Sequence, residues 1–158
     1  MLANKHTPIV DMQLLLKDAG ALTASAALQV GSSNRIIDLN TSGGTPTAGM
    51  TAGADAGELN IVIDVSAIDL SSTNEAYTIH LQGSSSSTFA SDIANLASLE
   101  LNAAPTGSAT VVGAVGRHLM IAPTWKNGVS YRYIRGYLVA AGTTPSINFT
   151  MAITKDMT

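Results

Sequence analysis

Two runs of alternating apolar and polar residues close the chain. The first run, residues 131–138, has tyrosine or arginine at every odd position and Arg, Ile, Gly and Leu at the even ones. The second run, residues 147–153, is apolar at every odd position. Period-two alternation in two runs separated by a Gly/Thr/Pro break at residues 140–145 predicts a β-hairpin with one buried face. Most aromatic residues lie on or near this hairpin, so we expect its tyrosines to pack inward and the rest of the chain to pack onto it.

The same alternation predicts strands further upstream. Residues 58–68 place Leu59, Ile61, Ile63 and Val65 on one face, and residues 77–82 repeat the pattern after a turn at 71–75. Because one run follows the other directly, we expect the two strands to pair in an antiparallel meander.

Shorter segments complete the predicted set of elements. Residues 9–28 favour an extended segment over a helix because Gly20 weakens a helix, and residues 89–101 fit a helix and a strand equally well. Residues 125–128 predict the last turn before the hairpin. Further short strands are predicted at residues 34–39, 109–115 and 117–122.

Short strands separated by Gly, Ser and Pro, without a long helix, predict an all-β fold: a jelly-roll-like antiparallel β-sandwich. We expect a polar N-terminal arm at residues 1–8, followed by a single domain over residues 9–158. Residues 41–57 contain five glycines and no large side chain except Met50. A loop of this length is typically functional or becomes ordered on a partner.

Charge is scarce on this chain. Only 12% of the 158 residues are charged, so we expect part of the surface to be covered by partners or by copies of the chain itself, as a dimer or trimer. The net charge of −3 and eight scattered Lys and Arg residues argue against nucleic-acid binding. The apolar run near the N-terminus is too short for a membrane span and lacks a signal-peptide layout, so no membrane partner and synthesis in the cytoplasm are expected.

The sequence offers little for catalysis. His6, His80 and His118 are isolated, and the chain has no cysteine, so neither a zinc site nor a Cys nucleophile is predicted. No Gly-x-Ser-x-Gly elbow supports a Ser-His-Asp site; Asp64 and Asp69 instead indicate a solvated face and a turn. We predict a protein that is not an enzyme and needs no cofactor.

Four stretches, in their order along the chain, carry a resemblance to a known family. They are Asp-Ala-Gly-Ala-Leu-Thr-Ala-Ser at 18–25 with Asn-Arg-Ile-Ile-Asp-Leu at 34–39, Ile-His-Leu-Gln-Gly-Ser at 79–84 with Phe89 shortly after, Gly-Arg-His-Leu-Met-Ile-Ala-Pro at 116–123, and Tyr-Arg-Tyr-Ile-Arg at 131–135 with the strand to Ile153. In this order they resemble the capsid cement, or decoration, proteins of short-tailed phages, of the kind found on a Bordetella phage. The chain departs from that pattern in the serine run after residue 84 and in the length of the 41–57 loop.

The resemblance implies a jelly-roll virion structural protein on the outer surface of an icosahedral capsid, made in the host cytoplasm. As a homo-oligomer it would clamp adjacent subunits of the major capsid protein, its partner, and no family catalytic residue exists to transfer. The rival interpretation is a jelly-roll module for carbohydrate or a host surface, with Trp125 and the tyrosines as an exposed stacking platform. The residues we expect at the capsid or oligomer contact come from the arm, the loop and the rim of the domain: Met1, Leu2, Ile9, Met12, Met50, Arg117, Trp125, Arg132 and Arg135.

Overall fold

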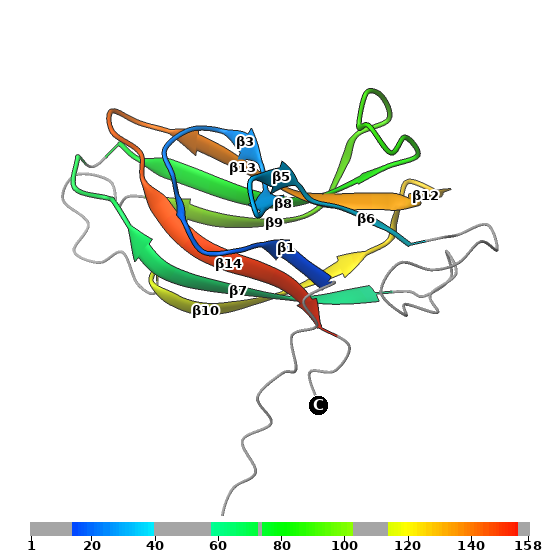
Figure 1. Cartoon of the computed structure of the whole chain (residues 1–158), viewed down its shortest axis with the longest axis horizontal. Coiled ribbons are helices and arrows are strands. Elements are labelled where there is room, and N and C mark those ends of the chain that lie inside the picture. The colour runs from blue at the N-terminus through cyan, green and yellow to red at the C-terminus, as the bar shows by residue number, and fades with distance from the viewer. Residues whose placement is uncertain (1–13, 40–57, 73, 103–113, 155–158) are drawn as a thin grey trace, which may run out of the picture.

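The chain folds into two antiparallel β-sheets packed face to face, seen as an upper and a lower layer in the computed structural model (Figure 1). The structure describes residues 14–39, 58–72, 74–102 and 114–154. The predicted all-β sandwich is therefore confirmed. The predicted arm, the Gly-rich loop and most of the strand predicted at 109–115 lie outside the described residues.

Within the described ranges, ten of the strands form these two sheets. Sheet A has the order β1-β14-β7-β10, with β2 also paired to β14. Its strands are β1 (Leu15–Lys17), β2 (Ala21–Leu22), β7 (Glu58–Ile68), β10 (Gly116–Pro123) and β14 (Ile147–Thr154). Sheet B has the order β3-β13-β8-β9, with β6 also paired to β13. Its strands are β3 (Ala26–Ala27), β6 (Ile36–Asp38), β8 (Ala76–Ser84), β9 (Ala94–Asn102) and β13 (Tyr133–Ala141).

Two small hairpins flank these sheets. They are β4 (Gln29–Val30) with β5 (Ser33–Asn34), and β11 (Trp125–Lys126) with β12 (Val129–Ser130). The turn of the second hairpin, Asn127 and Gly128, has positive φ at both residues, as a type I′ turn requires. The turn predicted at 125–128 therefore exists, but it closes a hairpin of its own.

Most successive long strands cross from one sheet to the other, although β8 and β9 pair within sheet B. β7 belongs to sheet A and β8 to sheet B, so the predicted meander of residues 58–82 is wrong. Likewise β13 pairs with β8 whereas β14 pairs with β7, so the predicted C-terminal hairpin is also wrong. The physical reason is that each strand buries its apolar face against the opposite sheet, and a short connection reaches across the sandwich as well as it reaches a neighbouring strand.

Tyr77 ties two of these crossings together. Its buried hydroxyl donates to the Asp69 carbonyl at 2.7 Å, just after β7, and accepts from the Ser146 backbone N–H at 2.8 Å, just before β14. The Asp69 N–H donates in turn to the Ser146 carbonyl at 2.8 Å. Both crossings therefore meet at one end of the sandwich.

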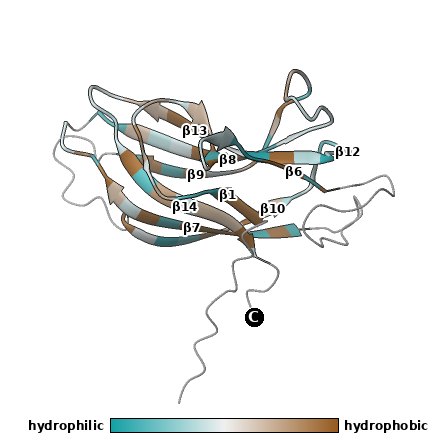
Figure 2. Ribbon diagram, in the orientation of Figure 1, coloured by the Kyte–Doolittle hydropathy of each residue, from teal (hydrophilic) through white to brown (hydrophobic). Residues whose placement is uncertain are grey.

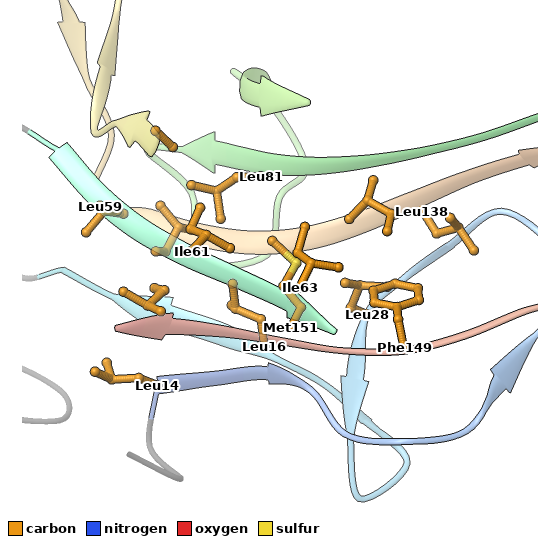
Figure 3. Packing of buried hydrophobic residues seen from close by; sticks show 14 of the residues in the cluster. Leu14, Leu16, Leu28, Leu59, Ile61, Ile63, Leu81, Leu138, Phe149 and Met151 are labelled. Carbon is orange, nitrogen blue, oxygen red and sulfur yellow. The ribbon is translucent and has the colours of Figure 1, made fainter. Parts of the chain in front are cut away.

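The core lies between the sheets (Figure 2). The odd-numbered residues predicted for β7 and β14 do face inward, and Figure 3 shows members of both strands, such as Ile63 and Phe149, in this cluster. In β13, however, the buried positions are Ile134, Gly136 and Leu138. Tyr133 and Tyr137 occupy the outer face, so the prediction that the tyrosines pack inward is wrong for these two, whereas Tyr131 is buried.

The structure decides between helix and strand where the sequence pattern fits both. Residues 94–102 form strand β9, so the helix alternative over 89–101 is wrong in that part. The described part of the 9–28 segment contains three short strands and is extended, as predicted. The predicted strand at 34–39 is present as the end of β5 and the whole of β6, interrupted at Arg35.

Candidate functional site

The predicted contact residues do not come together at one place. Arg117 lies on the outer face of sheet A, because its neighbours in β10 alternate inward and outward. Arg135 lies on the outer face of sheet B, Arg132 lies over the Tyr133 ring, and Trp125 projects from the β11–β12 hairpin. The remaining predicted contacts lie outside the described residues: Met1, Leu2, Ile9, Met12 and Met50.

The outer face of sheet A carries a row of apolar side chains. Leu15 aligns with Ala152, Ala152 with Val62, and Val62 with Leu119, so the row crosses all four strands. An outward sheet face ordinarily carries polar residues. Here the row ends at Leu119 in the edge strand β10, where Leu119 and Ile121 are 59% and 55% exposed.

Exposed apolar side chains concentrate in the same part of the chain. Most of the large hydrophobic residues that are exposed among those described fall between residues 115 and 129, a segment we call the β10–β12 apolar stretch. Its exposed members are Val115, Leu119, Ile121, Trp125 and Val129. A group of large apolar side chains in water is a candidate surface for binding another macromolecule.

Two of the three arginines expected at the contact are paired with carboxylates. Arg117 donates two hydrogen bonds to the Asp64 carboxylate at 2.8 and 2.9 Å, and Arg132 donates two to Asp38 at 2.8 Å each. The hydrogen bond from Arg117 lowers the pKa of Asp64 below its ordinary value. Both residues of this first pair are well exposed, so the pair contributes little to stability.

Removing Arg117 tests that pairing. In Arg117→Ala we expect the pKa of Asp64 to rise towards its ordinary value, because the hydrogen bond and the nearby positive charge are lost. Since the folded pKa lies below the unfolded one, the stabilisation is present above the unfolded pKa and is lost as the pH falls through the folded value. Its size at neutral pH is below about 1 kcal/mol. Carboxylate ¹³C NMR titration measures the shift.

Asp69 provides an internal control in the same titration. The pKa of Asp69 is lowered by hydrogen bonds from Ser71, which Arg117 does not touch. The pKa of Asp69 is expected to be the same in Arg117→Ala as in the wild type. If the pKa of Asp64 were also unchanged, the pairing of Arg117 with Asp64 would be contradicted.

The outer face of sheet B is polar and aromatic. Tyr133, Arg135 and Tyr137 lie half-buried along β13, and His80 on β8 is hydrogen-bonded through Nδ1 to Ser98 Oγ at 2.7 Å. His80 thus makes a local hydrogen bond on the outer face of sheet B. Burial lowers its pKa below the ordinary value, so the ring is more readily neutral.

Several residues of both faces were missed by sequence reasoning. Leu119 and Ile121 lie in a correctly predicted strand, but alternation alone does not say which set faces water. Gln82 and Asn95 are common polar residues with no motif around them. Such residues become neighbours only through the register between the strands.

Over the described ranges, no group of three or more His, Asp or Glu side chains is placed to hold a metal ion. No helix in that part of the chain is long and apolar enough to cross a membrane. The sequence matches no protein-family model, and no curated protein is significantly similar to it.

Proposed function

We propose that the protein is a virion structural protein that binds the outside of an icosahedral capsid and cements adjacent major capsid protein subunits. The observation that carries the proposal is the β10–β12 apolar stretch, which presents large apolar side chains on an edge strand and a hairpin. The order of motifs that resembles phage cement proteins supplies the identity of the partner. A partner that covers these side chains would remove them from water.

The scarcity of charge supports the same function. A shell-binding protein needs a modest contact repeated many times, and binding through several copies multiplies a weak affinity by avidity. A homo-oligomer, dimer or trimer, supplies such repetition. The uncharged surface favours association with a neighbouring protein and offers little to nucleic acid.

We further assign the sandwich to the jelly-roll class. With β1 and β2 counted as one position and β3 and β6 as another, the strands follow the order 1-8-3-6 in sheet A and 2-7-4-5 in sheet B. Eight positions in two sheets with repeated crossings are typical of two nested Greek keys. The contact between β9 and β10 at the side of the sandwich fits that order.

The rival interpretation as a glycan module with Trp125 and Tyr131 on one platform has less support. Trp125 is 51% exposed, whereas Tyr131 is buried between the hairpin and sheet B, where its backbone N–H donates to the Thr124 carbonyl. These two rings therefore do not form a joint exposed surface.

The double variant Leu119→Ser, Ile121→Ser tests the proposal. We expect its affinity for capsids that lack the protein to fall by about tenfold or more, because two exposed apolar anchors are lost from the contact. Co-sedimentation with such capsids over a range of protein concentrations measures saturation and stoichiometry. The fold should be unchanged, since neither side chain belongs to the core.

Val139→Ser is the matched control. Val139 is also exposed and apolar, at 40%, but it lies on the outer face of sheet B. It should bind capsids like the wild type. Wild-type protein that fails to saturate capsids, or a double variant that binds as well as the control, would contradict the proposal.

A further inference from the structure

A chain of hydrogen bonds crosses the outer face of sheet B. Arg135 Nε donates to Gln82 Oε1 at 2.9 Å, and Gln82 Nε2 donates to Asn95 Oδ1 at 3.0 Å. Lys126 Nζ donates to the Asn95 carbonyl at 2.8 Å, so the row runs from β13 to the β11–β12 hairpin. The bulge between β8 and β9 lies on β9, where Leu96 is the extra residue between Ala97 opposite Leu81 and Asn95 opposite Gln82, and it places Asn95 on the same outer face as Gln82.

Arg135 fixes which group donates and which accepts along this hydrogen-bond chain. A guanidinium has no acceptor, so the Gln82 oxygen must face Arg135 and the Gln82 amide nitrogen must face Asn95. The oxygen of Asn95 is then used, and its Nδ2 group remains as a donor. No described residue accepts a hydrogen bond from Asn95 Nδ2 or from the Nη atoms of Arg135. The row therefore presents donors only.

Arg135 differs from the two other arginines predicted at the contact. Arg117 and Arg132 are each paired with a carboxylate, whereas Arg135 contacts the neutral Gln82 and two aromatic rings. Its Cζ lies 4.3 Å from the Phe89 ring centroid and 5.3 Å from that of Tyr137. Burial lowers the pKa of Arg135, as expected for a cation that lacks an acidic partner. Stacking fixes the plane of the guanidinium.

The serine run after β8 builds the loop that holds Phe89 against Arg135. Ser84 Oγ donates to the Ser91 carbonyl at 2.8 Å, and Ser85 Oγ donates to the Asp92 carboxylate at 2.8 Å. Phe89 itself is buried and has a φ of 53°, a left-handed conformation that is rare for a bulky residue and concentrates at functional sites. The departure of this loop from the resembling family thus has a local structural role.

We infer that Arg135 and Asn95, flanked by Tyr133 and Tyr137, form a binding site for a carboxylate-bearing sugar such as a uronic or sialic acid. A carboxylate accepts two parallel hydrogen bonds from a guanidinium, and a row of donors matches its oxygens. The half-buried tyrosine rings offer flat surfaces to the sugar ring, and hydroxyl and amide groups nearby suit its hydroxyls. A protein partner would require an apolar centre, and this face around Arg135 is polar.

Two acidic sugars and one neutral sugar serve as probes: 3′-sialyllactose, trigalacturonate and lactose. We expect at least one of the acidic sugars to shift the ¹⁵N signals of the Arg135 side chain and the Asn95 amide in NMR titrations of the full chain, and lactose to leave them in place. In Arg135→Gln the affinity should fall by about tenfold or more, and Arg135→Lys should stay well below wild type because lysine lacks the planar fork.

Arg117→Gln is the matched control, since it removes an arginine from the opposite sheet and should leave sugar binding unchanged. Equal binding of lactose and the acidic sugars, no shift with either acidic sugar, or wild-type affinity in Arg135→Gln would overturn the inference. Loss of capsid binding in Arg135→Gln without any sugar binding would also overturn it and assign Arg135 to the capsid contact. Arg135 and Asn95 do not belong to the β10–β12 apolar stretch, so failure of the sugar site leaves the proposed capsid function standing.

Discussion

Replacement of Gly136 by valine is expected to destabilise the protein by about 3 kcal/mol. Gly136 faces the core from β13, and a Cβ atom there would lie 2.4 Å from Leu28 Cδ1 and 3.1 Å from Met151 Sδ. Leu28 is fully buried, and its N–H donates to the Gly136 carbonyl at 3.0 Å, so the two backbones cannot separate without breaking that bond. Urea denaturation followed by circular dichroism measures the change in the free energy of unfolding.

The Leu28→Ala background separates overpacking from other causes. Leu28→Ala alone should cost about 2 to 5 kcal/mol through the cavity it leaves. The added valine methyl groups then have room, so the extra cost of Gly136→Val should largely disappear in that background. An equal cost in both backgrounds would show that the contact with Leu28 is not the reason glycine is required.

The Tyr77→Phe variant is expected to lose about 2 to 4 kcal/mol of stability. The substitution removes only the hydroxyl. The Asp69 carbonyl then loses its hydrogen bond from that hydroxyl at 2.7 Å, and the Ser146 N–H loses its hydrogen bond to it at 2.8 Å. Both groups sit at the crossings that carry the chain between the sheets. Burial also raises the pKa of Tyr77, so the hydroxyl is protonated and able to donate across the neutral range. Thermal and urea unfolding of the variant test this expectation.

Tyr137→Phe is the comparison that isolates the hydrogen bonds. Tyr137 is half-buried on the outer face of sheet B, and no described residue is hydrogen-bonded to its hydroxyl. Its replacement should change the free energy of unfolding by only a few tenths of a kcal/mol, in the range usual for surface substitutions. If both Tyr→Phe variants lost the same stability, Tyr77 would not hold the crossings together.

The strands were predictable because alternation is a local property of the sequence. Residues 58–68 were assigned to a strand with the bounds that the structure gives to β7, and Ile61 and Ile63 were placed on its buried face. Strand partners are not local. The connection of residues 142–146 is short enough for a hairpin, and nothing in its Gly, Thr and Pro residues distinguishes a turn within one sheet from a crossing between two.

The faces of β13 were misassigned for a related reason. Both the odd-numbered and the even-numbered residues of 131–138 include large side chains, so either set could face the core. The size of Tyr133 and Tyr137 favours the odd-numbered set, but the structure buries the even-numbered one. Gly136 contributes nothing to an apolar count, although it is the residue that Leu28 packs against. The hydrogen-bond chain from Arg135 through Gln82 to Asn95 could not be predicted from the sequence. These residues meet only because of the register between the three strands that carry them.

Strands β1 and β14 pair with each other, although they lie close to opposite ends of the described part of the chain. Since β14 is an inner strand of sheet A, with β1 on one side and β7 on the other, the sheet stays open until the last residues of the domain have been synthesised. Phe149, Met151 and Ile153 are also missing from the core until then. Long-range pairing of this kind slows folding and leaves apolar strands unprotected on the nascent chain. Sheet A therefore cannot close before β14 has left the ribosome, and a truncation before Ile147 would split sheet A through its middle.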